Sequence, residues 1–380
     1  MEMPTAAASL RTDALPVNRF LGLLRQSISA HGIFWAIVAN YYVGYLILLG
    51  LRPDLVPVNV GLGLLKVFWL SLPTLLFCII WLRLYHTIFY DRPTRPIVAV
   101  INGIVQYLIN PRRMANGLPM LLIMVIFGFI FTDVQAKILT VNPAVWDATF
   151  ANWDRVLHFG YQPWQWLQPI LGYAPVTFLI NLNYNIWLFV MWMYFSYFGF
   201  AERPSELRTQ FFLSFIVTWI VGGSILATIF ASGGPCYYTR LGLSPDPFVD
   251  LMTYLRTVNN VFPVWAIDIQ DALWRGHLGN VEMSEVSAMP SMHNASTLLF
   301  VLASFRISRF WGWVLSLHAV LIFIGSIHLA WHYAIDSYVS WALVLVIWYA
   351  MAPVARWWHS RAVQADFDRM LTVEPSFGAS

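Results

Sequence analysis

The sequence predicts an all-α, polytopic membrane protein, a helical bundle of about eight spans. Of its 380 residues, 59% are hydrophobic and only 11% are charged, whereas a soluble domain carries about 25% charged residues. The apolar residues come in runs of about 20, the length that an α-helix needs to cross a bilayer. The 19 Trp and 17 Tyr residues fit aromatic belts at the two membrane interfaces. A formal net charge of +3 does not indicate a nucleic-acid partner.

The predicted spans are eight apolar runs separated by connections of different lengths. In chain order they are 33–51, 61–85, 118–138, 175–199, 210–230, 291–305, 310–331 and 335–356. The sixth run is the shortest and begins inside a Pro-Ser-Met-His turn. We interpret residues 1–117 as a two-span extension with a cytoplasmic loop, 118–357 as a six-span catalytic core, and 358–380 as a cytoplasmic tail that frays over its last dozen residues.

The placement of basic residues predicts the orientation. Most of the 22 Lys and Arg residues fall in the inner segments when the N-terminus is cytoplasmic, as the positive-inside rule requires. Both termini are then cytoplasmic, and His293, His328, His332 and Asp336 lie together at the opposite face. That face is periplasmic or lumenal, and a bacterial inner membrane is the favoured location.

Two outer segments are longer than simple connectors. Residues 139–174 interleave Trp and other apolar residues with Asp, which predicts one or two amphipathic helices. These helices either lie in the membrane interface or pack across the top of the bundle. Residues 231–290 begin with Gly-Gly-Pro-Cys-Tyr-Tyr and continue with apolar residues at helical spacing from Phe248 to Val258, which predict another amphipathic helix. We interpret both segments as lids over a site at the interface.

Ionisable residues gather at the outer ends of the sixth and seventh spans, and such residues in membrane segments mark functional sites by default. Ser291 stands at the expected N-cap of the sixth span. The free N–H groups that follow an N-cap form an anion site that suits phosphate. His328, His332 and Asp336 are spaced by four residues, so they share one face if a single helix continues through all three.

A carboxylate one turn from an imidazole fixes its tautomer and stabilises its cationic form. Asp336 would therefore turn His332 into an activated nucleophile or base, and His293 on the neighbouring helix could act as a general acid. The remaining histidines are more simply explained as polar residues near the interfaces; they are His31, His86, His158, His277, His318 and His359.

Residues 290–293 (Pro-Ser-Met-His) and 332–336 (His-Tyr-Ala-Ile-Asp) resemble motifs of the type-2 phosphatidic acid phosphatase superfamily. That family has the pattern K-x6-R-P, P-S-G-H and S-R-x5-H-x3-D, and the resemblance covers the spans from the third or fourth onward. It implies that His332 attacks phosphorus to form a phosphohistidine, that Asp336 orients it, and that His293 protonates the leaving group and later acts as base. It also implies phospholipid and lipid-alcohol substrates in the bilayer, with no metal or other cofactor.

The sequence departs from the family pattern at one glycine position and at the cationic positions. Met292 replaces the glycine of P-S-G-H, and the S-R pair falls on Gly325 and Ser326, so the phosphate-binding arginine is missing. The only lysines, Lys66 and Lys137, do not match K-x6-R-P. A dianionic phosphomonoester benefits from several cations around its developing charge, whereas a phosphodiester carries one negative charge. The departures therefore favour transfer from a diester over hydrolysis of a monoester.

This reduced pattern is similar to the inositol-phosphorylceramide synthase branch, whose members move a headgroup from phosphatidylinositol to a ceramide hydroxyl. The Gly-Gly-Pro-Cys-Tyr-Tyr loop resembles a loop of that branch, which makes Tyr237 and Tyr238 candidate substrate-binding residues. Arg240 is the candidate phosphate cation, with a snorkelling interfacial arginine as the alternative. Ser291 and His328 complete the candidate substrate-binding set, although the motif assigns His328 no role.

The leading prediction is an integral-membrane phosphotransferase that moves a phosphorylated headgroup between lipids at the outer leaflet through a phosphohistidine. A phosphatase acting on a phosphomonoester or pyrophosphate lipid is the alternative. The spacing of His328 and His332 also resembles one histidine box of a metal-dependent lipid hydroxylase, but those enzymes need several boxes on the cytoplasmic side. A lipid or ion transporter with Asp336 in a proton relay is a further alternative, although duplicated halves are not evident.

Overall fold

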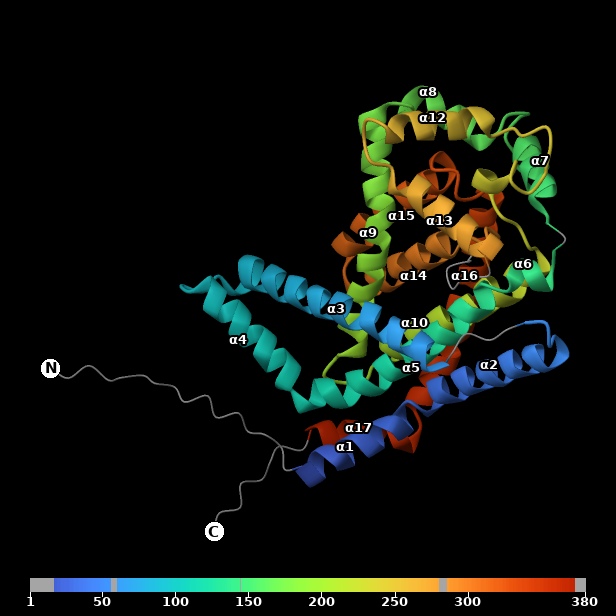
Figure 1. Ribbon diagram of the computed structural model, residues 1–380. Helices are drawn as coiled ribbons and strands as arrows, with labels where there is room; N and C mark the ends of the chain where they lie inside the picture. The colour runs from blue at the N-terminus through green and yellow to red at the C-terminus, as the bar shows by residue number, and fades with distance from the viewer. Residues whose placement is uncertain (1–16, 56–59, 144, 280–285, 373–380) are drawn as a thin grey trace, which may run out of the picture.

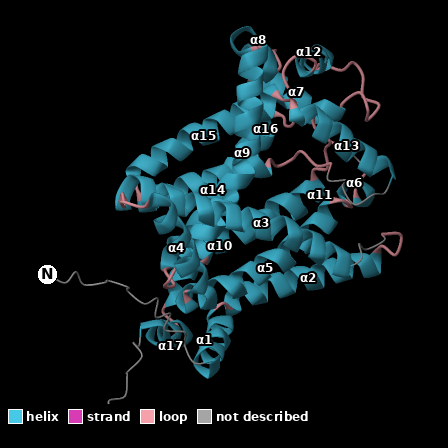
Figure 2. Ribbon diagram, turned by 60° about the vertical axis from the view of Figure 1, so that its left-hand side comes forward, coloured by secondary structure: helices cyan, strands magenta, loops and turns pink. Residues whose placement is uncertain are grey.

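The computed structural model describes residues 17–55, 60–143, 145–279 and 286–372, and the regular structure in these ranges is helical throughout (Figure 1, Figure 2). This confirms the predicted all-α class. The helices are α1 (Val17–Ala30), α2 (Gly32–Leu51), α3 (Val60–His86), η1 (Thr87–Asp91), α4 (Pro96–Ile109), α5 (Pro111–Gln135), α6 (Ile138–Val141), α7 (Asp147–Leu157), α8 (Pro163–Leu171), α9 (Ala174–Gly199), α10 (Glu206–Thr218), η2 (Trp219–Leu226), α11 (Ala227–Ile229), η3 (Pro235–Tyr237), α12 (Val249–Asn259), α13 (Trp265–Gly279), α14 (Met292–Ile307), α15 (Arg309–His328), α16 (Ala334–His359) and α17 (Ala362–Thr372).

Within the described residues, seven helical segments are long and apolar enough to cross a membrane. They are Gly32–Leu51, Ser71–Asp91, Pro111–Gln135, Ala174–Gly199, Glu206–Ile229, Arg309–His328 and Ala334–His359. The remaining predicted span, 291–305, forms α14, which has only 16 residues where about 20 are needed. It packs against α15, α10 and α16, and Leu299, Phe300 and Ala303 on it are completely buried. The short helix therefore forms the centre of the bundle, where its neighbours shield its polar first turn.

The predicted cytoplasmic loop between the second and third spans contains a further apolar helix, α4. Its apolar side chains are largely exposed, with Ile97 at 75% and Ile101 at 54%. Nε of Arg83 donates to the carbonyl of Gly103 at 3.0 Å, which holds α4 against the end of α3. Exposed apolar surface of this kind fits contact with lipid better than contact with water, so this segment is more than a connecting loop.

The fifth span changes from an α-helix to a π-helix at η2, and this π-helical segment lies close to the start of α14. A Cβ atom on Gly222 would lie 3.4 Å from Cγ of Pro290 and only 3.0 Å from Leu343, so the glycine permits the close approach. Nε1 of Trp219 donates to Oγ of Ser296 at 3.2 Å. π-Helical turns are frequent at functional sites, and this one supports the helix that carries His293.

We call α7, α8, α12 and α13, with their connections, the cap; α7, α8 and α12 gather at the same end of the molecule in both ribbon views (Figure 1, Figure 2). Helix α7 packs onto α16 through a buried face that includes Asp147, Phe150 and Asp154, while Val156 on its other face is 67% exposed. Packing across the bundle is therefore the better of the two interpretations of 139–174. Helix α12 confirms the amphipathic helix predicted from Phe248 onward.

The C-terminal segment is more ordered than predicted. Residues 358–380 were expected to be a tail, but α16 continues to His359 and α17 follows it. Phe367 and Leu371 of α17 are buried against Leu23 of α1. The terminal helices therefore pack together, and Ala115 of α5 completes their small apolar cluster. Residues 373–380 lie outside the described ranges.

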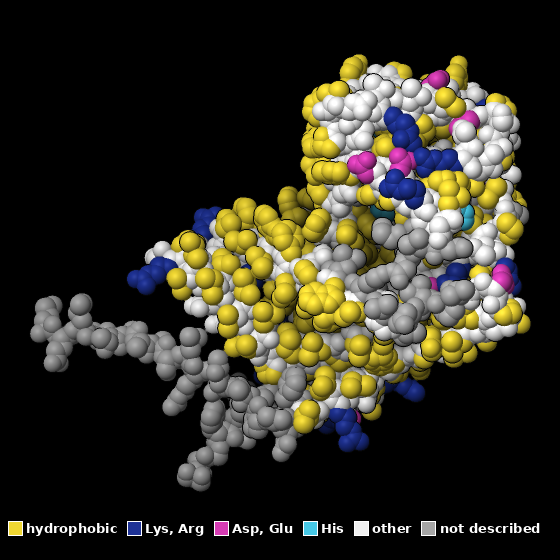
Figure 3. All heavy atoms as spheres, in the orientation of Figure 1, with side chains coloured by type: hydrophobic (Ala, Val, Ile, Leu, Met, Phe, Trp, Pro, Cys, Tyr) yellow, Lys and Arg dark blue, Asp and Glu magenta, His cyan; other side chains and the backbone are white. Residues whose placement is uncertain are grey.

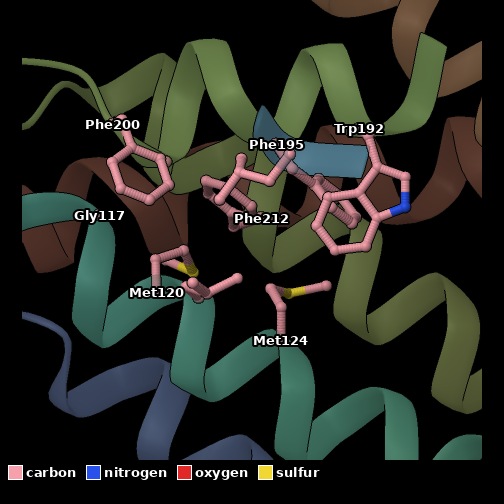
Figure 4. Close-up of a pocket in the computed structure, with 10 residues that line it drawn as sticks. Gly117, Met120, Met124, Trp192, Phe195, Phe200 and Phe212 are labelled. Carbon is pink, nitrogen blue, oxygen red and sulfur yellow. The ribbon is translucent and has the colours of Figure 1, made fainter. Parts of the chain in front are cut away.

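An apolar cavity lies between α3, α5, α9 and α10 (Figure 4). It is lined by Leu75, Gly117, Met120, Leu121, Met124, Trp192, Phe195, Gly199, Phe200 and Phe212. Its free volume of about 10 Å³ is close to the smallest that admits one water molecule. The candidate catalytic residues do not line it, so it belongs to the close-packed core of the bundle.

Candidate active site

The first turn of α14 has the predicted N-cap. Oγ of Ser291 accepts a hydrogen bond from the backbone N–H of Asn294 at 3.4 Å. Nδ2 of Asn294 donates to Oγ of Ser291 at 3.0 Å and to Oγ of Ser326 at 2.7 Å. The N–H groups of Met292 and His293 have no partner within the helix, as at every helix N-terminus. They make this turn able to receive an anion.

The helix breaks between His328 and Asp336, so the condition under which His328, His332 and Asp336 would share one helical face is not met. Helix α15 ends at His328, and Ala330 adopts a left-handed conformation with φ of 60°, which cannot continue an α-helix. The backbone N–H of His332 donates back to the carbonyl of Ser326 at 3.0 Å, which closes the turn. Helix α16 then begins at residue 334. His332 therefore lies in the turn and Asp336 on the next helix.

The structure nevertheless brings His332 and Asp336 together. Nδ1 of His332 lies 2.9 Å from the carbonyl oxygen of Ala288 and 3.4 Å from Oδ2 of Asp336. Both neighbours are acceptors, so Nδ1 carries the hydrogen and Nε2 keeps its lone pair. Oδ2 of Asp336 also accepts the N–H of Tyr333 at 3.1 Å. His332 is 8% exposed and Asp336 is completely buried, so within this pair only the imidazole has any accessible surface.

His293 lies beside this pair, on the neighbouring helix. Its ring centroid is 6.2 Å from that of His332. It stacks on Tyr184 at 4.5 Å and lies 4.1 Å from Trp187, both on α9. The two aromatic rings hold the imidazole in place. A centroid separation of 6.2 Å leaves room for one phosphorus centre between the two histidines, because reacting atoms in a productive complex are about 3–3.5 Å apart.

His328 has different partners from His332. It is completely buried, and its Nε2 lies 2.9 Å from Oγ1 of Thr177, which in turn contacts the hydroxyl of Tyr254 at 2.7 Å. These contacts tie α15 to α9 and α12. They give His328 hydrogen-bond partners of its own, which do not belong to the pair of His332 and Asp336.

The loop that starts at Gly233 packs directly on the turn that contains His332. Gly234 has φ of 97°, and a Cβ there would lie 2.6 Å from the carbonyl oxygen of Trp331. The N–H of Cys236 donates to the carbonyl of Ala330 at 3.0 Å. Only glycine combines this backbone conformation with so close an approach, so Gly234 fits the loop to the turn that contains His332.

Tyr237 and Tyr238 are buried in the cap, at 2% and 7% exposure. The hydroxyl of Tyr237 donates to the carbonyl of Gln270 at 2.9 Å, and its ring stacks on Trp274 at 5.2 Å. Tyr238 packs edge-on against Phe248. Both tyrosines, expected to contact substrate, are placed where they join the loop to α12 and α13.

Arg240 lies in a cluster of charges on the cap. It forms an ion pair with Asp271, and Arg256 lies 3.2 Å from the same carboxylate. Figure 3 shows basic and acidic side chains side by side on this part of the molecule, above a mostly hydrophobic surface. Burial opposes ionisation of Asp271, but hydrogen bonds from Arg256 and Arg240 hold its pKa below the ordinary value. Two partly exposed arginines thus share one carboxylate, which leaves one net positive charge.

Two buried carboxylates on α7 escaped the sequence interpretation. Asp147 accepts the N–H groups of Gly233 and Gly234 at 2.9 and 2.7 Å, and the hydroxyl of Tyr333 at 2.8 Å. Burial raises the pKa of Asp147, and these hydrogen bonds partly oppose the rise. The carboxylate of Asp147 therefore joins the loop at Gly233 and Gly234 to Tyr333, the residue that follows His332.

Asp154 lies two turns along the same face of α7. Its oxygens accept the N–H groups of Ala334 and Ile335 at 2.6 and 2.9 Å. Burial raises its pKa to about 7, and the charge of Asp336 adds to the rise. The sequence held one signal for this site: Asp147 and Asp154 fall on the same helical face as the buried Phe150, where a solvated acid is not expected.

The family model described as the PAP2 superfamily matches residues 148–350, more than half of the chain. The chain belongs to the PAP2 superfamily. The matched region contains most of α7, the rest of the cap and both histidine motifs. PAP2 proteins are lipid phosphatases and phosphotransferases, so this chain is a membrane enzyme of that general class. It matches no curated protein and no solved structure.

Proposed function

We propose that this PAP2 enzyme transfers a phosphorylated headgroup from a phospholipid to the hydroxyl of a second lipid, as inositol-phosphorylceramide synthases do. The observation that carries the proposal is the environment of His332. Its Nδ1 is held by two acceptors, Ala288 and Asp336, which leaves Nε2 free to attack. At the same time, the position where the family pattern has an arginine is the neutral Ser326.

In the first step, Nε2 of His332 attacks phosphorus in line with the lipid oxygen. The N–P bond forms, the P–O bond to the lipid breaks, and His293 gives its proton to the departing oxygen, which leaves as an alcohol. The phosphorylated imidazole carries a positive charge, which Asp336 stabilises through Nδ1–H. The headgroup stays on the enzyme as a phosphohistidine.

In the second step, His293 is neutral and takes the proton from the acceptor hydroxyl. The acceptor oxygen attacks phosphorus, a new P–O bond forms and the N–P bond breaks, which restores His332. A lipid acceptor yields a new phospholipid, and water in the same place yields a released headgroup phosphate. The choice of acceptor therefore decides between transferase and phosphatase.

The charge of the site supports a diester donor. Oγ of Ser326 donates to the carbonyl of Ile322 at 2.8 Å and accepts from Asn294, so neutral groups occupy the place of the cation. The N–H groups at the start of α14 supply the remaining positive potential. One negative charge on a phosphodiester suits this arrangement better than two on a monoester.

Arg240 and Arg256 support recruitment of an anionic headgroup. They share Asp271 on the cap, so a phosphate can compete with that carboxylate for either guanidinium. Because the pair is partly exposed, its contribution is modest and sensitive to salt. This assigns Arg240 to capture of the substrate, ahead of the chemical step.

The arrangement of charge along single helices supports a site on the non-cytoplasmic face. Helix α14 has His293 near its first residue and Arg306 near its last, and α16 runs from Asp336 to Arg356. Arginines favour the cytoplasmic ends of spans, so the catalytic groups occupy the opposite ends. The terminal helices α1 and α17 also lie away from the cap (Figure 1).

The test uses purified protein in lipid nanodiscs with phosphatidylinositol labelled in its headgroup, with and without ceramide or diacylglycerol. Thin-layer chromatography should show a new labelled lipid that appears only with an acceptor and is missing with His332→Ala. Release of water-soluble inositol phosphate without any new lipid would identify a hydrolase and contradict the proposal. The same assay with donor phospholipids that carry other headgroups shows which headgroup the enzyme transfers.

A further inference from the structure

We propose that Asp154 is a positioning residue for catalysis, which fixes the first turn of α16 and through it holds Asp336 against His332. This inference rests on the proposed role of His332 as the nucleophile. Asp154 is 1% exposed and lies on α7, a helix that carries none of the motif residues.

Asp154 caps the two N–H groups at the start of α16 that the helix's own side chains leave unbonded, because Asp336 accepts only the N–H of Tyr333. Tyr333 is the N-cap residue of this helix, and its side chain makes no capping hydrogen bond to the helix; tyrosine is not among the residues that cap well. The first two N–H groups of α16, from Ala334 and Ile335, instead donate to one oxygen each of Asp154, which lies 180 residues earlier in the chain than Ala334. The capping hydrogen bonds at the start of α16 therefore come from a residue on a distant helix, α7.

The position of Asp336 depends on these two capping hydrogen bonds. Asp336 is in the first turn of α16, directly after the two residues that Asp154 holds. Uncapped helix ends fray, and the turn before α16 already contains the left-handed Ala330. The separation of 3.4 Å between Asp336 and Nδ1 of His332 is at the long end for a hydrogen bond. A further shift of a few tenths of an ångström would end the contact.

Helix α7 is itself held in place by several contacts, so it can set the position of the first turn of α16. Asp147 holds the glycine loop and the hydroxyl of Tyr333, and Nε2 of His158 lies 3.0 Å from the hydroxyl of Tyr338. Nδ1 of His158 also lies 2.6 Å from the carbonyl of Asp154. These contacts bracket Asp154 at both ends of α7 and fix its carboxylate relative to α16.

The test is a double-mutant cycle on the full-length protein in nanodiscs. Asp154→Asn replaces one carboxylate oxygen with an amide NH₂ that faces a backbone N–H, so one cap bond is lost. We expect kcat to fall about ten- to a hundredfold with KM within about threefold. If Asp154 acts through Asp336, the same substitution in an Asp336→Asn background should change kcat by less than about threefold.

Trp164→Phe is the matched control, because it removes one hydrogen bond of α8, from Nε1 of Trp164 to the carbonyl of Pro247 at 3.2 Å, without removing any hydrogen bond of α7 or α16. Its kcat should stay within about twofold of wild type. Asp154→Glu, which keeps the charge but displaces the oxygens, is the second variant if the asparagine protein does not fold. It should show the same dependence on Asp336.

Equal losses of kcat in both backgrounds would overturn the inference, and so would a loss of kcat in Trp164→Phe as large as that in Asp154→Asn. Full activity of His332→Ala in the same assay would instead contradict the proposed function. The two failures are therefore distinguishable.

Discussion

Nδ1 of His332 and Oδ2 of Asp336 lie 3.4 Å apart although a helix break separates the two residues. His332 is held in the turn by the carbonyl of Ala288, whereas Asp336 is held by the first turn of α16. The geometry that one continuous helix would have imposed is thus built from two elements, and each contributes separately to the orientation of the imidazole.

Asp336→Asn should lower kcat by about ten- to a hundredfold. Loss of the sole orienting aspartate costs about 10⁴-fold in a serine protease triad because the wrong tautomer forms. Here the carbonyl of Ala288 still accepts from Nδ1 of His332, so the tautomer is retained and only charge stabilisation is lost. Turnover of labelled phospholipid measures the effect. A loss as complete as that of His332→Ala would show that Ala288 does not hold the tautomer.

His293→Ala should lower turnover of a natural phospholipid by about 10²–10⁴-fold, the usual contribution of a general acid. A p-nitrophenyl phosphodiester needs no protonation of its leaving group, so the variant should still release one nitrophenolate per enzyme in a rapid burst. The second step should then stall, because His293 is also the base that activates the acceptor. Stopped-flow absorbance checks this, with wild type as the multiple-turnover control; absence of a burst would argue against the acid role.

Asp271→Asn should lower KM for an anionic phospholipid, and Arg240→Ala should raise it, each by up to about fivefold. Asp271 is ionised at neutral pH because the two arginines hold its pKa below the ordinary value against the effect of burial. Its removal frees both guanidinium groups for the lipid phosphate. The size follows from the roughly 0.2–1 kcal/mol typical of exposed ion pairs, taken as an upper range for side chains that are 28–46% exposed. Arg275→Ala, on the exposed side of α13, is the control; equal KM values in all proteins would exclude capture by this cluster.

Asp154 should make the stability of the protein depend on pH. Burial raises its folded-state pKa to about 7 from an ordinary 3.8, so the folded chain retains a proton that the unfolded chain releases. The resulting stability is present in full below the ordinary pKa and is lost as pH rises through about 7, by at most about 1.4 kcal/mol per pH unit. Tryptophan-monitored melting at pH 5 to 8 should show wild type losing stability relative to Asp154→Asn; parallel curves would refute this.

Local patterns were sufficient to predict much of the fold. Apolar runs located the spans because membrane helices must be long and apolar, and Ser291 marked the start of α14 because N-cap chemistry is local. The motif spacing also indicated that His293, His332 and Asp336 should be considered as one group. It did not reveal the break after His328, because Leu329 to Tyr333 contains neither glycine nor proline, and the left-handed Ala330 is stabilised by tertiary contacts.

The residues that hold the site in place depend on contacts distant in sequence. The partners of Asp154 are about 180 residues away, and no periodicity connects α7 with the first turn of α16. The surroundings of Tyr237 and Tyr238 are a second example. The sequence pattern of an aromatic pair in a loop does not reveal that the two rings pack against Trp274 and Phe248.

The covalent intermediate is the central claim, and rapid acid- and alkali-quench experiments test it most directly. Wild type mixed with donor phospholipid labelled at phosphorus should acquire protein-bound label that is stable in alkali and lost in acid, as a phosphohistidine requires. The label should decay when acceptor lipid is added, and His332→Ala should acquire none while inserting normally into the membrane. Wild type that forms product in a single turnover without bound label, or His332→Ala that becomes labelled, would contradict the account.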